Sequence, residues 1–240
     1  MKVYLIRHAE SVGNIKGSLT STTDFELTEK GKLQAKRVGN LLYEELKGKQ
    51  VAAYCSPLLR AKQTLEEILC CIGENNIKIT QTDDLKEMDL GILEGMPYDE
   101  QLKKYPDIDW GKRLSVFHAP EGECYQDVKN RVQRFWNNCF SQFYEGENIL
   151  IVSHGITLRV LTNLLLNRPD EDVNFLNWME NTARTVLAYD EEKCTFFIER
   201  LNDYAHLQEL KTSNYQEWGL FAEQDAYIYK CNSGCVALGE

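Results

Sequence analysis

The chain has 240 residues, 43% of them hydrophobic and 27% charged, which is typical of a globular protein with a sizeable core. Its formal net charge of -10 argues against nucleic acid as a partner, but not against a small anion bound by a few local arginines. No apolar run is long enough to cross a membrane and the N-terminus does not resemble a signal peptide, so we expect a cytoplasmic protein without a membrane partner.

Short apolar runs alternate with segments of helical periodicity along most of the chain. We predict strands at Val3–Ile6, Val51–Tyr54, Lys78–Thr82, Ile149–Val152, Thr185–Tyr189 and Thr195–Glu199. We predict helices after Thr28, a candidate N-cap, and over Ala61–Cys71, Asp127–Phe143 and Gly155–Leu166. The alternation favours an α/β fold, a three-layer sandwich with helices on both faces of a mostly parallel central sheet.

Two segments depart from this alternation. Residues 88–122 are less periodic and are interrupted by prolines, and we interpret them as a small lid excursion from the core. Residues 208–240 form a C-terminal extension, in which Tyr227–Cys231 and Cys235–Leu238 flank an Asn-Ser-Gly turn and suggest a hairpin. We therefore expect one catalytic domain over residues 1–207, followed by the extension.

The eight cysteines are scattered along the chain. Without a secretory signal, free thiols are expected rather than disulfides. Cys231 and Cys235 are close in sequence, but two further zinc ligands are not evident nearby, so we predict no metal site and no cofactor.

Four of the predicted strands carry polar side chains at or beyond their carboxyl ends. Arg7-His8 follows the first strand, Arg60 the second, Glu87 the third and His154 the fourth. This edge of an α/β sheet is where ligands bind. Arginines can hold a phosphate, neutral imidazole can attack phosphorus, and a carboxylic acid can protonate the leaving alkoxide. The set therefore suits phosphoryl transfer without a metal.

Six motifs occur in a fixed order over residues 1–207. They are Arg7-His8-Ala9-Glu10-Ser11 with Asn14, Leu27–Ala35 (Leu-Thr-x-x-Gly-x-x-Gln-Ala), Ser56–Thr64 (Ser-Pro-Leu-x-Arg-Ala-x-Gln-Thr), Glu87–Gly95 (Glu-x-x-x-Gly-x-x-Glu-Gly), Pro120-Glu121-Gly122-Glu123-Cys124 and Ser153-His154-Gly155. In this order they resemble the histidine phosphatase superfamily, in its phosphoglycerate mutase-like branch.

The resemblance implies a role for individual residues. His8 would be the nucleophile that forms a phosphohistidine, and Glu87 the general acid that later activates water. Arg7, Arg60 and His154 would hold the phosphoryl oxygens. Substrate contacts would come from Asn14, Thr20, Ser21 and Gly155.

The sequence leaves some of these assignments open. Glu94 and Asp89 compete with Glu87 for the role of general acid, and the motif register favours Glu87. Ala9 stands where the family usually has glycine, which is expected to restrict the turn after the nucleophile. Cys124 stands where the family has serine.

We expect a metal-independent phosphomonoesterase that hydrolyses a small phosphorylated metabolite, a sugar phosphate or similar, through a phosphohistidine. The alternatives are a phosphoglycerate mutase and a regulatory or phosphoprotein-directed member of the same fold. Mutases of this kind typically carry a much longer insertion than Met96–Ala119, which favours the phosphatase. The extension at 208–240 has three open roles: to cover the site, to cap the sheet edge or to form a homodimer contact.

Overall fold

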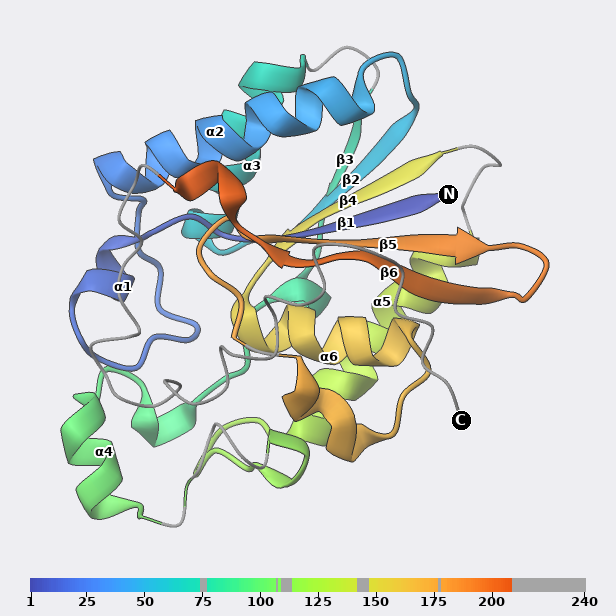
Figure 1. Cartoon of the computed structure of the whole chain (residues 1–240). Helices are drawn as coiled ribbons and strands as arrows, with labels where there is room; N and C mark the ends of the chain where they lie inside the picture. Colours follow the sequence, from blue (N-terminus) through green and yellow to red (C-terminus); the bar gives the residue numbers. More distant parts are fainter. Residues whose placement is uncertain (74–76, 107, 109–113, 142–146, 177, 209–240) are drawn as a thin grey trace.

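In the part of the chain that the structure describes, the sheet has six strands, and each of them was predicted from the sequence. The computed structural model describes residues 1–73, 77–106, 108, 114–141, 147–176 and 178–208 (Figure 1). The strands lie in the order β3-β2-β4-β1-β5-β6. Their bounds are Lys2–Arg7 (β1), Val51–Cys55 (β2), Lys78–Gln81 (β3), Asn148–Ser153 (β4), Arg184–Asp190 (β5) and Thr195–Asp203 (β6).

Strands β1 to β4 are parallel, and their register brings their carboxyl ends to one edge. Arg7 of β1 lies opposite Ser153 of β4, and Cys55 of β2 lies opposite Val152 of β4. Strand β5 pairs antiparallel with β1, and β6 pairs antiparallel with β5. The predicted mostly parallel sheet is therefore confirmed for its first four strands, with an antiparallel hairpin on one side.

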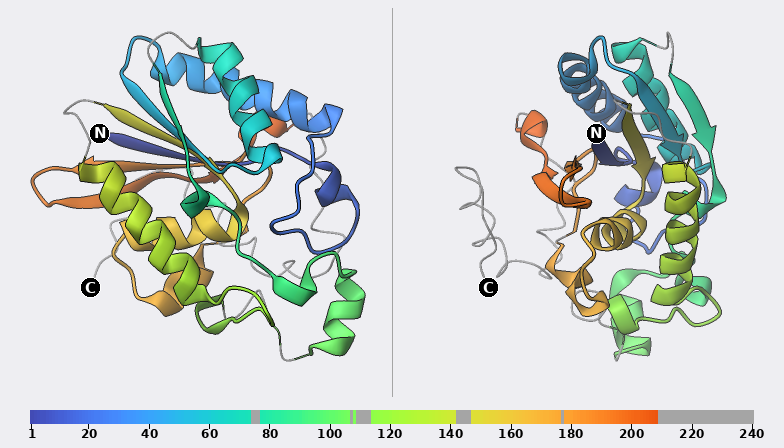
Figure 2. Two further views of the ribbon diagram at one scale, coloured as in Figure 1. Left: turned by 180° about the vertical axis from the view of Figure 1, so that it is seen from behind. Right: turned by 90° about the vertical axis from the view of Figure 1, so that its right-hand side faces the viewer.

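Helices cover both faces of the sheet (Figures 1 and 2). On one face lie α2 (Glu29–Leu46) and α3 (Leu59–Ile72), and on the other lie α5 (Tyr125–Ser141) and α6 (Gly155–Leu165). Alternate side chains of β1 enter separate cores: Tyr4 and Ile6 pack with α2 and α3, whereas Val3 and Leu5 pack with α5 and α6. The α/β sandwich is confirmed. Thr28 caps α2 as predicted, because its hydroxyl accepts a hydrogen bond from the Gly31 amide at 2.9 Å.

The remaining elements are short and lie in the connections. They are α1 (Val12–Ile15), α4 (Tyr98–Lys104) and five 3-10 turns at Asp83–Leu85 (η1), Gly91–Leu93 (η2), Leu114–Val116 (η3), Asp170–Phe175 (η4) and Ala205–Leu207 (η5). The start of the predicted excursion packs against the loop after β1: the Leu19 amide donates to the Met96 carbonyl at 3.0 Å, and the Gly95 amide donates to the Leu19 carbonyl at 2.7 Å.

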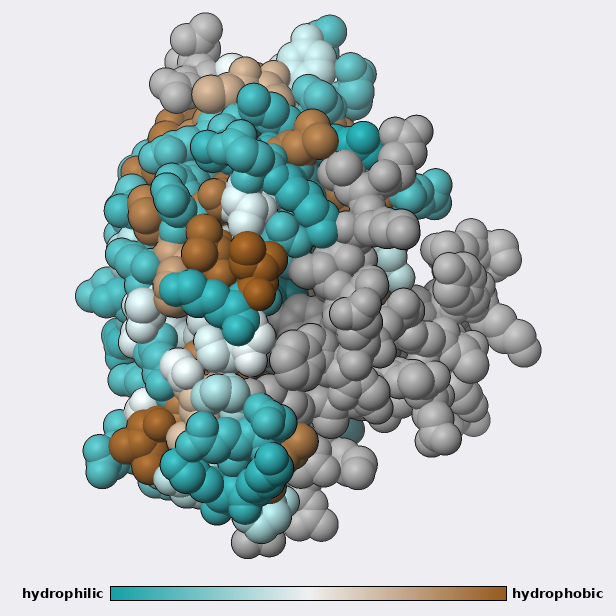
Figure 3. Space-filling view, turned by 90° about the vertical axis from the view of Figure 1, so that its left-hand side faces the viewer, coloured by the Kyte–Doolittle hydropathy of each residue, from teal (hydrophilic) through white to brown (hydrophobic). Residues whose placement is uncertain are grey.

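The hairpin predicted within 227–238 lies outside the described residues. Among the helices that the structure describes, none combines the length and apolar character that a membrane span needs. The edge with the strand carboxyl ends and α1 faces the viewer in Figure 3, where the described surface is mostly hydrophilic with small apolar clusters.

Candidate active site

His8 follows β1 and is 4% exposed. Its Nδ1 lies 2.8 Å from the carbonyl oxygen of Ala9, so Nδ1 carries the proton and Nε2 keeps its lone pair. The Nε of Arg60 lies 3.3 Å from this Nε2 and donates to it. Burial lowers the pKa of His8 well below its usual range, and the charges of Arg60 and Arg7 lower it further. His8 is therefore a neutral imidazole whose Nε2 can act as a nucleophile.

Arg60, in the first turn of α3, is held by neutral groups. Its Nη1 donates to the Thr23 carbonyl at 3.0 Å, and its Nη2 donates to the Ser21 carbonyl at 2.5 Å. With His8, these are its hydrogen-bond partners in the described part of the chain. Arg60 is 2% exposed, and burial lowers the pKa of its guanidinium. A buried cation without a bonded carboxylate is suited to bind an anion.

Arg7, the last residue of β1, brings a second guanidinium to the same edge of the sheet. Its Nη1 donates to the Met179 carbonyl, and its Cζ lies 5.3 Å from the centroid of the Trp178 ring. It is close enough to His8 for its charge to lower the pKa of that imidazole. Two arginines from different elements thus flank the nucleophile.

His154 is the N-cap residue of α6 and is fully buried. Its ring centroid lies 5.1 Å from that of His8, with the two ring planes tilted by 56°. Its Nε2 lies 2.8 Å from the Ser56 hydroxyl oxygen, and its Nδ1 is buried with no hydrogen-bond partner among the described residues. Burial lowers the pKa of His154 well below its usual range, and the nearby Arg60 and His8 lower it further. In the tautomer with the proton on Nδ1, Nε2 accepts from the Ser56 hydroxyl and Nδ1 can donate to a phosphoryl oxygen.

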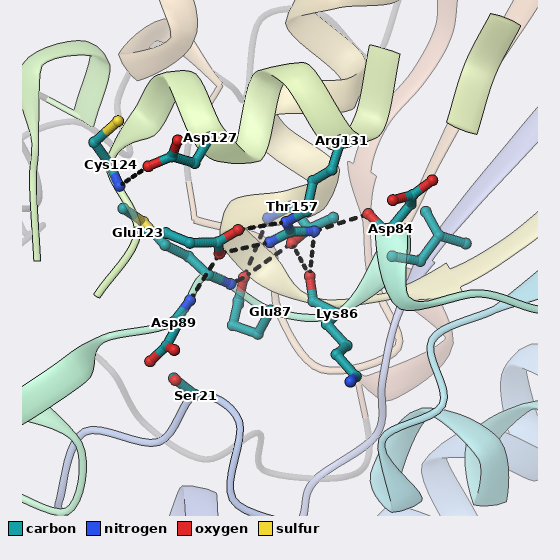
Figure 4. A network of polar contacts seen from close by, with 12 residues as sticks. Ser21, Asp84, Lys86, Glu87, Asp89, Glu123, Cys124, Asp127, Arg131 and Thr157 are labelled. Atoms are coloured by element: carbon teal, nitrogen blue, oxygen red, sulfur yellow. Dashed lines mark hydrogen bonds and ion pairs between the residues drawn. The ribbon is translucent and has the colours of Figure 1, made fainter. Parts of the chain in front are cut away.

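Glu87 is held at the amino end of α6, beside His154. Its Oε2 accepts from the Ile156 amide at 3.2 Å, and its Oε1 accepts from the Met88 amide at 2.9 Å and the Thr157 amide at 3.2 Å. Figure 4 shows Glu87 beside Thr157, together with the neighbouring polar network of Arg131 and Glu123. The carboxylate is also near enough to Arg60 to raise the pKa of its guanidinium. This position is suited to exchange a proton with a group bound at the arginines.

The two competing carboxylates hold loops. Glu94 accepts hydrogen bonds from the amides of Ser21 and Thr23 at 3.0 and 2.8 Å, and so fixes the carbonyls that bind Arg60. Burial would raise the pKa of Glu94, but the Thr23 and Ser21 amides lower it to about 2. Asp89 accepts from the Gly91 amide at 2.9 Å. These contacts support Glu87 as the acid.

The expected substrate residues lie around this centre. Asn14, in α1, accepts from the Ser11 amide at 3.0 Å, and Thr20 is partly buried beside Gly13. The Ser21 hydroxyl donates to Glu94 at 3.1 Å and accepts from the Leu90 amide at 3.1 Å, so its side chain is already engaged by the protein.

Gly155 opens α6, and a Cβ built on it would lie 3.2 Å from the Trp178 ring. Ala9 is fully buried and lacks the positive φ that would favour glycine, so the expected restriction of its turn is not found. The backbone around the nucleophile and the second histidine is thus tightly packed but unstrained at Ala9.

Sequence reasoning did not assign the roles of two residues that hold the site together, Thr64 and Asn181. The Thr64 hydroxyl accepts from the Ala9 amide at 2.9 Å and donates to the Arg60 carbonyl at 2.7 Å. The Asn181 side-chain amide donates to the His8 carbonyl at 2.9 Å. Thr64 and Ser56 are the two ends of one motif, which was the available signal. For Asn181, the only signal in the sequence was its position near the edge of the predicted sheet.

The comparison with known families agrees with this arrangement. The profile of the histidine phosphatase superfamily, branch 1, matches residues 3–204. The chain belongs to the histidine phosphatase superfamily. The five residues His8, Arg7, Arg60, Glu87 and His154 all lie within the matched region.

Relatives in this superfamily carry different activities in their names. The chain is 32% identical over 205 residues to a 2,3-bisphosphoglycerate-dependent phosphoglycerate mutase of Porphyromonas gingivalis, covering 73% of this chain and 82% of the relative. Among solved structures it is similar to Bacillus stearothermophilus YhfR, at 30% identity and a TM-score of 0.74, covering 86% and 99% of the two chains. It is also similar to a candidate α-ribazole-5'-phosphate phosphatase of Escherichia coli, at 25% identity and a TM-score of 0.69, covering 85% and 97%.

Proposed function

We propose that this protein is a metal-independent phosphatase that hydrolyses a small phosphomonoester, such as a sugar phosphate, through a phosphohistidine at His8. The observation that carries the proposal is the state of His8: a buried, neutral imidazole whose Nδ1 proton is held by the Ala9 carbonyl and whose Nε2 lies 3.3 Å from Arg60 Nε. Nε2 keeps the single lone pair that can attack phosphorus, and the Arg60 guanidinium that donates to it here would turn to the phosphoryl oxygens of a bound substrate.

The reaction has two displacements at phosphorus. In the first, His8 Nε2 forms the N–P bond while the P–O bond to the leaving group breaks, and Glu87 gives its proton to the departing alkoxide. In the second, the Glu87 carboxylate takes a proton from water as the water oxygen attacks phosphorus. The N–P bond then breaks, inorganic phosphate forms and neutral His8 returns. Arg7, Arg60 and His154 stabilise the phosphoryl oxygens in both steps.

The burial of the reacting groups supports a small substrate. His8, Arg7, Arg60 and Glu87 are each between 2% and 8% exposed, and His154 is fully buried. A phosphoryl group and its ester oxygen can be held at this depth, whereas the surface of a folded phosphoprotein meets more steric hindrance. Asn14, Thr20 and Gly155 remain our proposed substrate contacts, and Ser21 acts through its carbonyl.

A phosphoglycerate mutase is the second candidate, because a mutase of Porphyromonas gingivalis is 32% identical. The two reactions differ in whether water or a substrate hydroxyl accepts the phosphoryl group from His8. The alignment has 205 positions, but the 73% of this 240-residue chain that it includes is fewer residues than that. The remaining aligned positions are residues of the mutase that have no counterpart in this chain. These extra residues in the aligned part of the mutase support the phosphatase.

The test is phosphate release by the purified protein from sugar phosphates, phosphoglycerates, nucleotides and phosphopeptides, with EDTA present. Release that a His8→Ala variant lacks, together with an acid-labile, alkali-stable phosphoenzyme, is the expected result. Transfer between phosphoglycerates with negligible hydrolysis would assign the chain to the mutases. Preference for phosphopeptides would assign it a protein substrate, and a folded protein that forms no phosphoenzyme would point to a regulatory member.

A further inference from the structure

Arg131 of α5 makes four hydrogen bonds beneath the segment that carries Glu87 (Figure 4). Its Nε and Nη2 bind the two oxygens of Glu123 at 2.8 and 3.1 Å, a bidentate pair. Its Nη1 donates to the carbonyl oxygens of Asp84 and Lys86, both at 2.8 Å. The Arg131 side chain is 10% exposed, so these bonds are largely shielded from water.

Glu123 extends the same network to the other side of Glu87. Its Oε2 accepts from the Asp89 amide at 2.9 Å, and its own amide donates to the Asp89 carbonyl at 2.9 Å. The backbone is thus held before Glu87, at the Asp84 and Lys86 carbonyls, and after it, at Asp89. We call Arg131 and Glu123 the 123–131 clamp.

The clamp shares a partner with the groups that bind the Glu87 carboxyl. The Lys86 carbonyl accepts from Arg131 and also from the Thr157 hydroxyl at 2.6 Å. That hydroxyl lies 3.2 Å from Glu87 Oε1, the oxygen that also binds the Thr157 amide. Loss of the clamp would therefore free the Glu87 backbone relative to α6, which also carries His154 at its start.

We propose that Arg131 and Glu123 are positioning residues for proton transfer by Glu87. The inference rests on the proposed phosphatase reaction and deepens it. Neither residue contacts the reacting atoms in this geometry. Their effect is to hold the Glu87 carboxyl where it can protonate a leaving group and later deprotonate water. Small displacements of a catalytic group reduce rates strongly, so we expect losses of about 10- to 100-fold in the steps that use Glu87.

Leaving-group dependence separates this role from a general loss of structure. An alkyl phosphate has a basic leaving group and needs a proton from Glu87 to form the phosphohistidine. p-Nitrophenolate leaves without a proton, so formation of the phosphohistidine from p-nitrophenyl phosphate does not depend on Glu87. Hydrolysis of the phosphohistidine needs Glu87 with either substrate, because water must be deprotonated.

The experiment is rapid-mixing kinetics on the full-length protein with p-nitrophenyl phosphate and with glycerol phosphate. The variants are Arg131→Lys, Arg131→Met and Glu123→Gln. Arg131→Lys keeps a positive charge but loses the bidentate pair and, with it, the simultaneous contact to both carbonyls. Arg134→Met is the matched control, because Arg134 lies on the same helix and pairs with the Asp84 carboxylate while 61% exposed.

In the clamp variants we expect the initial burst of p-nitrophenolate to keep its wild-type rate, and the steady-state rate to fall about 10- to 100-fold. Formation of the phosphohistidine from glycerol phosphate should slow by a similar factor, and Arg134→Met should behave as the wild type. An equal fall in the aryl burst and the alkyl step, or no fall in any variant, would overturn the proposal. A wild-type protein that forms no phosphohistidine would instead refute the proposed function itself, and the clamp proposal with it.

Discussion

Replacement of Thr64 by valine tests whether the nucleophile loop depends on one hydroxyl. Thr64 is fully buried in α3, and its Oγ1 accepts from the Ala9 amide at 2.9 Å. Valine has nearly the same shape, so packing is preserved while both hydrogen bonds of the hydroxyl, from the Ala9 amide and to the Arg60 carbonyl, are lost. The Ala9 amide is then left in a dry environment without its acceptor, because the residue itself is fully buried.

The magnitude follows from that single unsatisfied group. A buried amide left without a partner costs about 1–3 kcal/mol. For a chain of this size each kcal/mol corresponds to about 2–4 °C in Tm, so a loss of 2 kcal/mol would lower Tm by about 4–8 °C. Activity should fall as well, because the carbonyl of the same residue, Ala9, holds the Nδ1 proton of His8.

Urea unfolding at pH 7 without phosphate measures the stability loss, and kcat for phosphate release measures the effect on His8. Thr64→Ser retains the hydroxyl and serves as the control, with the smaller loss expected for one methyl group. A Thr64→Val protein that matched the wild type in both the free energy of unfolding and kcat would refute the reasoning. It would mean that the Ala9 amide finds another partner at no cost.

Three further changes have expected outcomes. Burial lowers the pKa of His206 from 6.5 to about 4, so between these pH values the unfolded chain binds one more proton than the folded protein, and stability falls as the pH drops. His206→Gln should therefore lose less stability than the wild type between pH 7 and pH 5 in urea unfolding. Equal losses would contradict this. Ser56→Ala removes the hydrogen-bond partner of His154 Nε2, so kcat should fall on the order of 10-fold and the ring ¹⁵N chemical shifts of His154 should change. Unchanged shifts would show that Ser56 does not control the tautomer of this ring. Gly31→Ala would place a Cβ 2.0 Å from the Glu10 carbonyl oxygen, so the free energy of unfolding, measured by thermal unfolding, should fall by about 1–3 kcal/mol or more. The control Lys32→Ala loses only an exposed ion pair and should leave Tm unchanged.

The sequence was sufficient for the strands and for the placement of the site. Runs such as Ile149–Val152 are buried on both sides, and such runs are apolar throughout, so they stand out without an alignment. His8, Arg60 and His154 each follow a buried strand or lie in the first turn of the helix after it, and parallel strands bring such positions to one edge. Glu87 instead follows the exposed edge strand β3, so it was chosen by the motif register. The antiparallel direction of β5 carries no comparable signal in its composition, and its hairpin with β6 was not predicted.

Backbone contacts explain most of what could not be predicted. Arg60 is held by the carbonyls of Ser21 and Thr23, and any residue type offers a carbonyl, so the sequence does not mark the positions. Ser21 was expected to contact substrate, and nothing in the sequence indicated that its hydroxyl bonds to Glu94 and to the Leu90 amide. The pair of Arg131 and Glu123 was likewise not predicted: Glu123 stood out only as part of the motif at 120–124, and Arg131 alone resembles an ordinary surface charge on a helix.

The position of β1 in the middle of the sheet has a consequence for synthesis. Its neighbours are β4 and β5, which are encoded more than 140 residues later, so the strand before His8 has no partners when it leaves the ribosome. At a synthesis rate of about 5–20 residues per second, β4 and β5 are made roughly 7–40 s after β1. The growing chain therefore cannot assemble the site on His8 until most of the domain has been made, and its apolar first strand depends on other contacts, or on chaperones, during that interval.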